Sequence, residues 1–564
     1  MINDKGYMKK SVCILLLVFS FLVYLQSPVL AQARRFTPRG WQLMDLKKDS
    51  IYGASVNRAY SELLVGKKSK QVIVAVIDAG VDTAHEDLRG RIWTNPREIP
   101  GNEIDDDHDG FVDDIHGWNF LGGKDGRNIS SDSYEGTREY FRLRPIYGDQ
   151  TDSALIDPNK RKEFAYWLKL KEAREKDSID QALEVTYLSE AVTQSTRADT
   201  LLRRASQKDT LYPKDIMSIP DSIAGPEKQK MLAVYKEFRI KPDQSLEDII
   251  KEEKRYLQEA KDRLAALDVD PNAERRDIVG DDPDNINDNR YGNSNIAAGT
   301  PSHGTHVAGI IAANRDNGIG IDGITNNVMI MAIRAVPNGD ERDKDIALAI
   351  RYAVDHGARV INMSFGKYYS PGKKWVDEAV QYAEKNDVLL VHAAGNEGKD
   401  MDLEMDYPNP MIESTKKMAT NFITVGASTG GPDSLLAAGF SNYGQKTVDL
   451  FAPGVSIYST VPGGGYQAFS GTSMAAPVVT GIAALIMEYY PSLTARQVKY
   501  VIENSVLRPT GVKVRVPGTK TKADFSTLSR TGGIANAYNA LKMASTLKGE
   551  RKLKETSTIK SRLE

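Results

Sequence analysis

Five short apolar runs restrict the fold of this chain more than any other feature. They are QVIVAVI (71–77), VMIMAIRAV (328–336), ARVINMS (358–364), DVLLVHAAG (387–395) and FITVGAS (422–428). Such runs, rich in β-branched residues, are typical of parallel strands buried on both faces. Segments with helical spacing lie between several of them, for example residues 343–357 and 373–386. The alternation predicts an α/β fold with a doubly wound, mostly parallel sheet and helices on both faces.

The N-terminal segment differs from the rest of the chain. Lys9 and Lys10 precede an apolar run at residues 12–25, and small residues follow it. This pattern is typical of a secretory signal peptide, with cleavage expected after Ala31 or Ala33. The run is shorter than the roughly 20 residues of a spanning helix, so we expect no stable membrane span after cleavage. The expected destination is the periplasm, the cell surface or the medium.

Residues 150–274 interrupt the alternation of strands and helices. Residues 245–267 begin with a serine and carry Asp248 three positions later, a pairing typical of a capped helix start. Upstream, apolar residues between Phe164 and Ala191 predict two further amphipathic helices. We expect a signal peptide (1–33), the first part of the α/β domain (34–130), a mainly helical insertion (131–275), the remainder of the α/β domain (276–545) and a charged, flexible tail (546–564).

Composition excludes several classes of function. The formal net charge is -2, from 74 basic and 76 acidic residues, so no overall field would recruit nucleic acid or an anionic membrane. The only cysteine, Cys13, lies in the predicted signal peptide. A mature chain would therefore have no disulfide, no catalytic thiol and no cysteine metal site.

Three polar residues stand where an α/β sheet can build a reactive site. Asp78 follows the apolar run at the carboxyl end of a predicted strand, where such sheets place their ligands. His303 begins the apolar segment SHGTHVAGIIAA, and Ser473 follows a tight turn in SGTSMAAP, at the head of an apolar helix. A serine hydroxyl needs a base within reach and a third group that orients the base. These three residues are candidates for that arrangement.

The segments around these residues resemble the signature blocks of the subtilisin-like serine proteases, the subtilases (peptidase S8 family). VIDAGVD contains Asp78, HGTHVAG contains His303 and GTSMAAP contains Ser473, in the order of that family. A fourth block, VHAAGNEG, resembles the oxyanion segment of the family and contains Asn396. The resemblance covers roughly residues 40–130 and 276–545. It implies a subtilisin-like fold and a serine endopeptidase that acts on protein or peptide substrates.

The resemblance also implies a role for each matching residue. Ser473 would attack the peptide carbonyl, His303 would act as the base, and Asp78 would orient the imidazole. Asn396 and the Ser473 N–H would stabilise the oxyanion. The implied substrate-binding residues are Ser364, Phe365, Gly366, Ala394 and Gly395. No cofactor is required for this chemistry.

Other interpretations remain for each residue at this stage. Asp78 alone would cap a loop, and Asn396 alone would be a turn residue. His303 and His306 are spaced like a metal pair, although the HExxH pattern is absent. Ser470, the other serine of SGTSMAAP, is expected to support the turn. A catalytically silent binding or scaffold protein on the same fold is the rival hypothesis, and the oligomeric state stays open.

An acidic loop predicts a structural calcium site. The candidate ligands are Asp105, Asp107, Asp109 and Asp113. Alternating carboxylates with Gly110 at the sixth position resemble the first half of a calcium loop, although His116 stands at the twelfth position, where a glutamate is usual. A solvated acidic loop is the alternative. A second cluster at residues 280–289 would complete the site or cap the insertion.

Two features bear on substrate choice. The helical insertion makes the segment between Asp78 and His303 much longer than the corresponding segment in most members of the family. The insertion would act as a cap over the site, as a dimerisation element or as an inert elaboration. The segment KDMDLEMDYP (399–408) aligns near the wall of the primary specificity pocket of the family and carries four acidic residues. A carboxylate facing the pocket would favour basic side chains, and a solvated loop is the alternative.

Overall fold

The structure is a computed structural model that describes residues 37–237, 245–267, 269–299, 301–431 and 434–552. The described chain divides into two compact units: residues 139–271 belong to one, and residues 37–138 with 272–552 belong to the other. The predicted signal peptide and residues 553–564 of the predicted tail lie outside the described residues.

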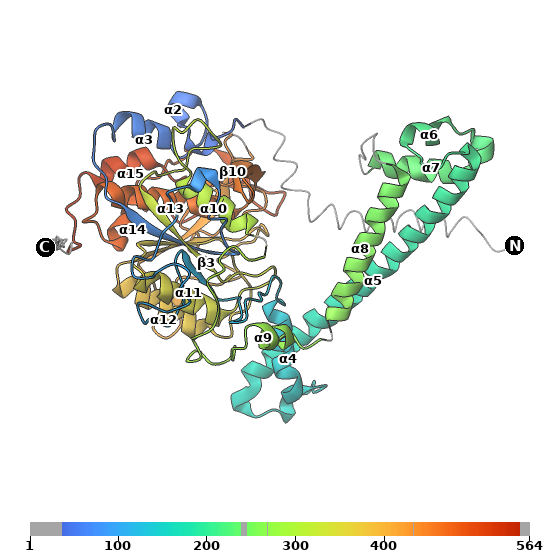
Figure 1. The fold of residues 1–564 in the computed structure, drawn as a ribbon, viewed down its shortest axis with the longest axis horizontal. Coiled ribbons are helices and arrows are strands. Elements are labelled where there is room, and N and C mark those ends of the chain that lie inside the picture. The colour runs from blue at the N-terminus through green and yellow to red at the C-terminus, as the bar shows by residue number, and fades with distance from the viewer. Residues whose placement is uncertain (1–36, 238–244, 268, 300, 432–433, 553–564) are drawn as a thin grey trace. The chain divides into compact units, whose positions relative to one another are not determined.

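A sheet runs through the larger unit, with helices on both sides of it (Figure 1). It has seven strands in the order β2-β3-β1-β4-β5-β8-β9. Its strands are β1 (Val72–Asp78), β2 (Gly117–Asn119), β3 (Val328–Arg334), β4 (Val360–Met363), β5 (Leu389–Ala393), β8 (Phe422–Ser428) and β9 (Leu450–Pro453). All neighbouring strands are parallel. The predicted parallel sheet is confirmed, and the short strands β2 and β9 are additions. β3 and β4 follow each other in the chain but pair with opposite edges of β1. The strand order therefore reverses at β1, and a topological switch point lies at its carboxyl end.

Helices cover both faces of this sheet, as predicted. Val74 and Val76 of β1 pack in one core cluster with α10 and α13, and the alternate residues Ala75 and Ile77 pack in another with α11 and α12. This alternation follows the two-residue period of a strand. The helices of this unit are α2 (Leu46–Asp49), α3 (Val56–Glu62), α9 (Ala273–Ile278), α10 (Ser302–Ala312), α11 (Asp343–Asp355), α12 (Lys373–Lys385), α13 (Thr472–Tyr489), α14 (Ala495–Asn504) and α15 (Ala537–Ala544).

Three short hairpins complete the larger unit. They are β6 (Met411–Ile412) with β7 (Lys417–Met418), β10 (Ile457–Val461) with β11 (Gly465–Phe469), and β12 (Lys513–Arg515) with β13 (Lys522–Asp524). The β10–β11 hairpin packs against α10, where the hydroxyl of Ser459 donates to the carbonyl of His306 at 2.8 Å. It therefore supports the helix that carries His303.

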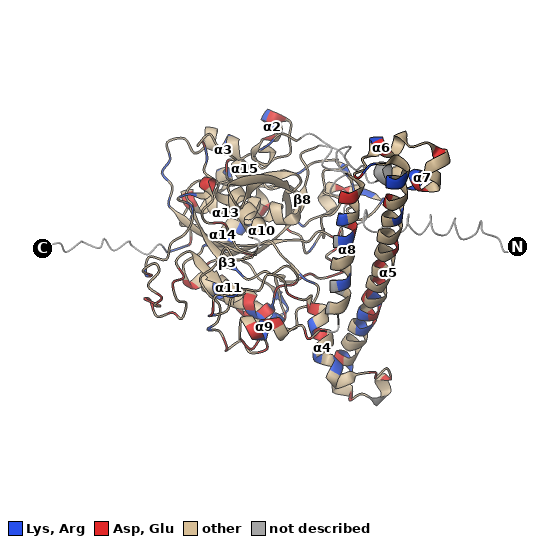
Figure 2. Cartoon of the chain, turned by 45° about the vertical axis from the view of Figure 1, so that its right-hand side comes forward, with Lys and Arg blue, Asp and Glu red and all other residues tan. Residues whose placement is uncertain are grey.

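The smaller unit is helical. Its main elements are α5 (Arg161–Ser206), α6 (Pro213–Ser218), α7 (Asp221–Glu237) and α8 (Leu246–Ala266), and α4 (Glu135–Tyr147) crosses the boundary between the units. α8 begins with the predicted capping box of Ser245 and Asp248. The prediction of two separate helices upstream is wrong, because residues 161–206 contain no glycine or proline that would end α5. Basic and acidic residues alternate along α5 and α8 (Figure 2).

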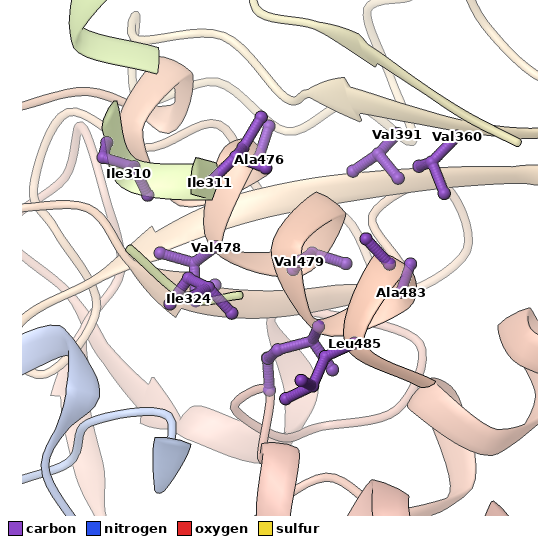
Figure 3. Packing of buried hydrophobic residues seen from close by; sticks show 14 of the residues in the cluster. Ile310, Ile311, Ile324, Val360, Val391, Ala476, Val478, Val479, Ala483 and Leu485 are labelled. Carbon is purple, nitrogen blue, oxygen red and sulfur yellow. The ribbon is translucent and has the colours of Figure 1, made fainter. Parts of the chain in front are cut away.

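The helix α13 forms the centre of the larger core (Figure 3). It packs against β4, β5 and α10, and Val479 and Ala483 lie in the same cluster as Val360 and Val391. In the described part of the chain it is the one helix long and apolar enough to cross a membrane, but 89% of it is buried inside the fold. It is therefore a core helix, apolar all round because neighbours surround it.

Candidate active site

Asp78 and His303 meet at the carboxyl end of β1. The Nδ1 atom of His303 lies 2.8 Å from Oδ1 and 3.0 Å from Oδ2 of Asp78. Asp78 is buried, and its Oδ1 also accepts the N–H of Ala79 at 2.8 Å. With Nδ1 donating to the carboxylate, Nε2 of His303 carries the lone pair and can accept a proton.

Two opposing effects set the pKa of His303. Burial lowers this pKa, because a charged imidazole loses solvation, but the negative charge of Asp78 and its hydrogen bond to the ring together outweigh burial and raise the pKa above its ordinary value. The side chain of His303 nevertheless remains 39% exposed, so a substrate can reach Nε2.

Ser473 is the second residue of α13 and is hydrogen-bonded to Ser364, the residue that follows β4. Its hydroxyl donates to the carbonyl of Ser364 at 3.2 Å, and the hydroxyl of Ser364 donates to the carbonyl of Ser473 at 3.0 Å. Pro477 has no N–H for the Ser473 carbonyl, so Ser364 supplies the missing donor. Within the described residues no hydrogen bond joins the Ser473 hydroxyl to His303. Ser473 thus lies in the first turn of α13, next to Ser364 of the predicted substrate-binding segment.

Asn396 is oriented by the residue that precedes Ser473. The backbone N–H of Thr472 donates to Oδ1 of Asn396 at 2.8 Å, and the Thr472 hydroxyl donates to the same atom at 3.1 Å. These two donors assign Oδ1, so Nδ2 of Asn396 lies on the other side of the amide. A Cβ placed on Gly471 would lie 3.7 Å from this Nδ2 and 3.6 Å from the backbone N of Ser473. Oδ1 of Asn396 lies 3.6 Å from the same point, so the amide of Asn396 and the backbone N–H of Ser473 lie close together beside Gly471. Thr472 orients this amide, a role that no sequence pattern indicates.

The predicted substrate-binding residues directly follow β4 and β5. Gly366 is exposed, and within the described part of the chain neither its N–H nor its carbonyl has a hydrogen-bond partner. The carbonyl of Phe365 accepts from Nε2 of His392 at 2.7 Å, and the carbonyl of Ala394 accepts from Asn442 at 2.9 Å. Side-chain hydrogen bonds thus hold both segments in place, and the backbone groups of Gly366 are the ones available to pair with another chain.

The alternative roles for the neighbouring residues are not supported. His306 is fully buried, its Nε2 bonds to the carbonyl of Gln467 at 3.1 Å, and its ring stacks on Phe469. The two histidines therefore have separate partners and do not form a metal pair. The hydroxyl of Ser470 accepts the backbone N–H of Ser456 at 2.8 Å, which supports the turn.

The acidic loop brings together a different set of carboxylates from the predicted one. Oxygen atoms of Glu98, Asp105 and Asp107 lie within 4.8 Å of one another, and Asp107 and Asp109 approach His356 in the same way. The carboxylate of Asp113 instead accepts the N–H groups of Gly101 and Glu103. Glu98 was not anticipated, because it precedes the loop and only folding places it there.

The second acidic cluster takes part in a buried ion-pair network. Asp281 accepts from Arg275 at 2.7 Å and from Lys344 at 2.7 Å, and Arg275 also pairs with Asp345 at 2.7 Å. Arg275 lies in α9, directly after the helical insertion. The cluster thus joins α9 to α11 within the larger unit.

These features resemble those of a serine hydrolase site: a serine in the first turn of a helix, a histidine bonded to a buried carboxylate, and an amide side chain close to the backbone N–H of the serine. The subtilase family model matches residues 69–534, which is most of the chain. The chain belongs to the subtilase family.

Individual relatives agree with this assignment. The chain is 40% identical over 242 residues to the thermophilic serine proteinase of Bacillus sp. (strain AK1). The matched region covers 43% of this chain and 52% of that protein. It is 39% identical over 210 residues to thermitase of Thermoactinomyces vulgaris, which covers 37% and 68%. A solved structure of proteases from Pseudoalteromonas arctica is 26% identical, covers 43% of this chain and 70% of that chain, and has a TM-score of 0.36. The chain spans about half the length of the first of these relatives.

Proposed function

We propose that this protein is an exported serine endopeptidase that hydrolyses peptide bonds through Ser473, His303 and Asp78. The observation that carries the proposal is the hydrogen bond of 2.8 Å between Nδ1 of His303 and Asp78, because it leaves Nε2 as the base. The open backbone edge at Gly366 supports an extended peptide as the substrate, since a peptide adds to such an edge through backbone hydrogen bonds.

In the proposed reaction, substrate binding is accompanied by rotation of the Ser473 hydroxyl from the Ser364 carbonyl towards Nε2 of His303. Such contacts are commonly loose before substrate binds. Ser473 Oγ then attacks the peptide carbonyl carbon while Nε2 takes the hydroxyl proton. The negative charge on the carbonyl oxygen is stabilised by Nδ2 of Asn396 and by the N–H of Ser473. The N–H of Ser473 is free for this role because the first N–H groups of a helix have no partner within it.

The intermediate collapses when Nε2 of His303 returns the proton to the leaving amine, which breaks the C–N bond and leaves an ester on Ser473. Water then attacks the ester with His303 again as the base, and the acid product leaves. Asp78 stabilises the imidazolium in both steps without taking the proton itself.

Labelling with a fluorophosphonate tests the proposal against the rival hypothesis of a silent scaffold. We expect modification of Ser473, identified by mass spectrometry, together with hydrolysis of a small chromogenic peptide. Ser473→Ala is expected to abolish both, and Ser470→Ala is the matched control because that serine only supports the turn. Absence of labelling in folded protein would favour the scaffold.

Export is part of the proposal and rests on the N-terminal pattern of the sequence. One relative is a cell wall-associated protease of Bacillus subtilis, 36% identical over 243 residues, which agrees with export. Sequencing the N-terminus of the mature protein tests this, and Gln32 or Arg34 is the expected first residue.

We also propose that the acidic loop binds calcium as a structural ion. The oxygens of Glu98, Asp105 and Asp107 form a cluster of hard ligands, which suits this cation. All three side chains are carboxylates, so this proposed calcium site has only oxygen ligands and no nitrogen or sulfur ligand. Calcium would hold the loop and would take no part in the hydrolysis.

The helical insertion is proposed to restrict which substrates reach the site. Its first helix, α4, begins with Glu135, whose carboxylate pairs with Lys367 at 2.7 Å. Lys367 directly follows Gly366 of the substrate-binding segment. The chain thus leaves the larger unit shortly after a residue that is paired with the segment that would hold substrate, and for this reason we favour a cap over a dimerisation element or an inert elaboration.

A further inference from the structure

The segment at residues 399–408 contains four acidic residues with different environments. Asp400 accepts the N–H of Asp402, and the carboxylate of Asp402 in turn accepts backbone N–H groups of a neighbouring loop. Glu404 is exposed and pairs with Lys399 at 2.8 Å. Only Asp406 is buried, with 6% of its surface exposed. Asp406 is therefore the member of the segment whose surroundings require an explanation.

Backbone pairing places Asp406 between the two predicted substrate-binding segments. The N–H of Lys367 donates to the carbonyl of Tyr407 at 3.0 Å, and the N–H of Tyr407 donates back at 2.9 Å. A Cβ on Gly366 would lie 2.7 Å from Oδ2 of Asp406, and a Cβ on Gly395 would lie 3.2 Å from the same oxygen. The carboxylate therefore occupies the space that side chains at both glycines would fill.

Within the described residues, no basic side chain forms an ion pair with the carboxylate of Asp406. Its only hydrogen bond in that part of the chain comes from the N–H of Tyr407 at 2.9 Å. The adjacent Lys367 is engaged by Glu135 and Asp343. Burial, together with the nearby negative charges of other carboxylates, raises the pKa of Asp406 well above its ordinary value. A buried, ionised carboxylate in this position destabilises the folded protein unless a cation pairs with it.

The space beside Asp406 suits a long side chain. A cavity of about 60 Å³ is lined by residues that include Ala394, Met401, Met405, Pro408 and Asp406. Methionine side chains are flexible and apolar, so they can pack along an aliphatic stem. Lysine and arginine combine such a stem with a cationic end. A second carboxylate, that of Glu397, approaches the same wall, because its Oε2 lies 2.9 Å from the Cβ position of Gly395.

We propose that Asp406 forms the anionic end of the primary specificity pocket and that the enzyme cleaves after lysine or arginine. The inference rests on the proposed endopeptidase function and names its substrate class. The stem of the substrate side chain packs along the methionines, and its cation pairs with Asp406.

The test is kcat/KM for matched peptide substrates that differ only at the residue before the cleaved bond: lysine, arginine, methionine or phenylalanine. The wild-type enzyme is expected to prefer lysine and arginine by at least about 100-fold, since a buried carboxylate left without its cation penalises neutral substrates. Asp406→Asn is expected to lower kcat/KM for the basic substrates by about 100-fold and to leave or raise that for methionine. Glu404→Gln, an acid-to-amide change on the exposed part of the same segment, should change neither.

The outcomes separate this inference from the proposed function. Equal wild-type kcat/KM for basic and neutral substrates overturns the inference, whatever the stability of the Asp406→Asn variant. An equal loss for all substrates in Asp406→Asn also overturns it, because a merely structural role would act on every substrate. Peptidyl phosphonates carrying a lysine-like or a norleucine side chain supply the second readout. Faster labelling of Ser473 by the lysine-like probe supports the inference. Equal labelling by the two probes overturns the inference but leaves the proposed endopeptidase function intact. Labelling by neither probe overturns the proposed function and the inference with it.

Discussion

The side chains of His303 and Asn396 are each oriented by a hydrogen bond to a residue distant in sequence. Nδ1 of His303 is committed to Asp78, so only Nε2 remains to take a proton. Asn396 is held through Oδ1 by Thr472, so only Nδ2 remains to face an oxyanion. Donors that are fixed before the reaction need not reorganise as charge develops, which is the main way such a site lowers a barrier.

The raised pKa of His303 predicts the acid side of the activity profile. Protonated His303 cannot act as a base, so kcat/KM falls as pH drops through its pKa, and full activity lies above that pKa. Because Asp78 raises this pKa, the midpoint is expected above about 6.5, the ordinary value of histidine. Asp78→Asn should lower kcat by about 10⁴-fold and move the midpoint of the residual activity to lower pH.

The measurement is kcat/KM for a small peptide between about pH 5 and pH 9, a range that brackets the ordinary pKa of histidine. Asp82→Asn is the matched control, because the carboxylate of Asp82 only accepts backbone N–H groups. An Asp78→Asn variant with an unshifted acid midpoint would contradict the role given to Asp78.

Secondary-structure elements bring these residues together through their ends. Asp78 ends β1, Ser364 follows β4, and His303 and Ser473 each occupy the first turn of a helix. The exchange of hydrogen bonds between Ser364 and Ser473 joins β4 to α13. The same principle applies to the acidic loop, where the folded chain sets Glu98 beside the carboxylates of a later turn.

The loop predicts a calcium-dependent stability. A chelator is expected to lower the melting temperature by about 3–5 °C and added calcium to restore it, since a ligand that binds only the folded state stabilises that state. In Asp105→Ala the chelator should have no further effect. Differential scanning calorimetry provides the measurement, and identical melting in chelator and in calcium would refute the site.

At the scale of the whole molecule, the chain consists of a catalytic unit and a helical unit with its own small core. The two ends of the insertion meet within the catalytic unit, where Arg342 donates both to Asp132 and to Asn272. Arg138, at the start of the insertion, is buried beside Glu135. These contacts all belong to the catalytic unit, so excision of the helices between them would remove none of the residues that make them.

Excision of Glu139–Pro271, with Arg138 and Asn272 joined by a Gly-Ser linker, tests the proposed cap. We expect unchanged kcat/KM for a small chromogenic peptide and at least about a tenfold gain on a folded protein substrate, because an element that gates entry limits the larger substrate. The excised chain with Ser473→Ala controls for contaminating protease. Equal relative rates on both substrates before and after excision would argue against a cap.

The sequence by itself determined the architecture of the sheet and the candidates for catalysis. Buried strands such as β1 are continuous apolar runs, and Asp78, His303, Ser473 and Asn396 lie in local motifs that can be recognised without coordinates. Local patterns suffice here because strand burial and motif spacing are properties of neighbouring residues.

Only the tertiary structure decided which of several equivalent residues matter. Asp406 differs from the three other acids of its segment because a backbone bridge between Lys367 and Tyr407 turns it inward. Glu98 joins the acidic loop, and Thr472 orients Asn396, through contacts that no periodicity encodes. Burial and pairing between distant segments arise only when the chain packs, and these long-range contacts set the charge and shape that a substrate meets.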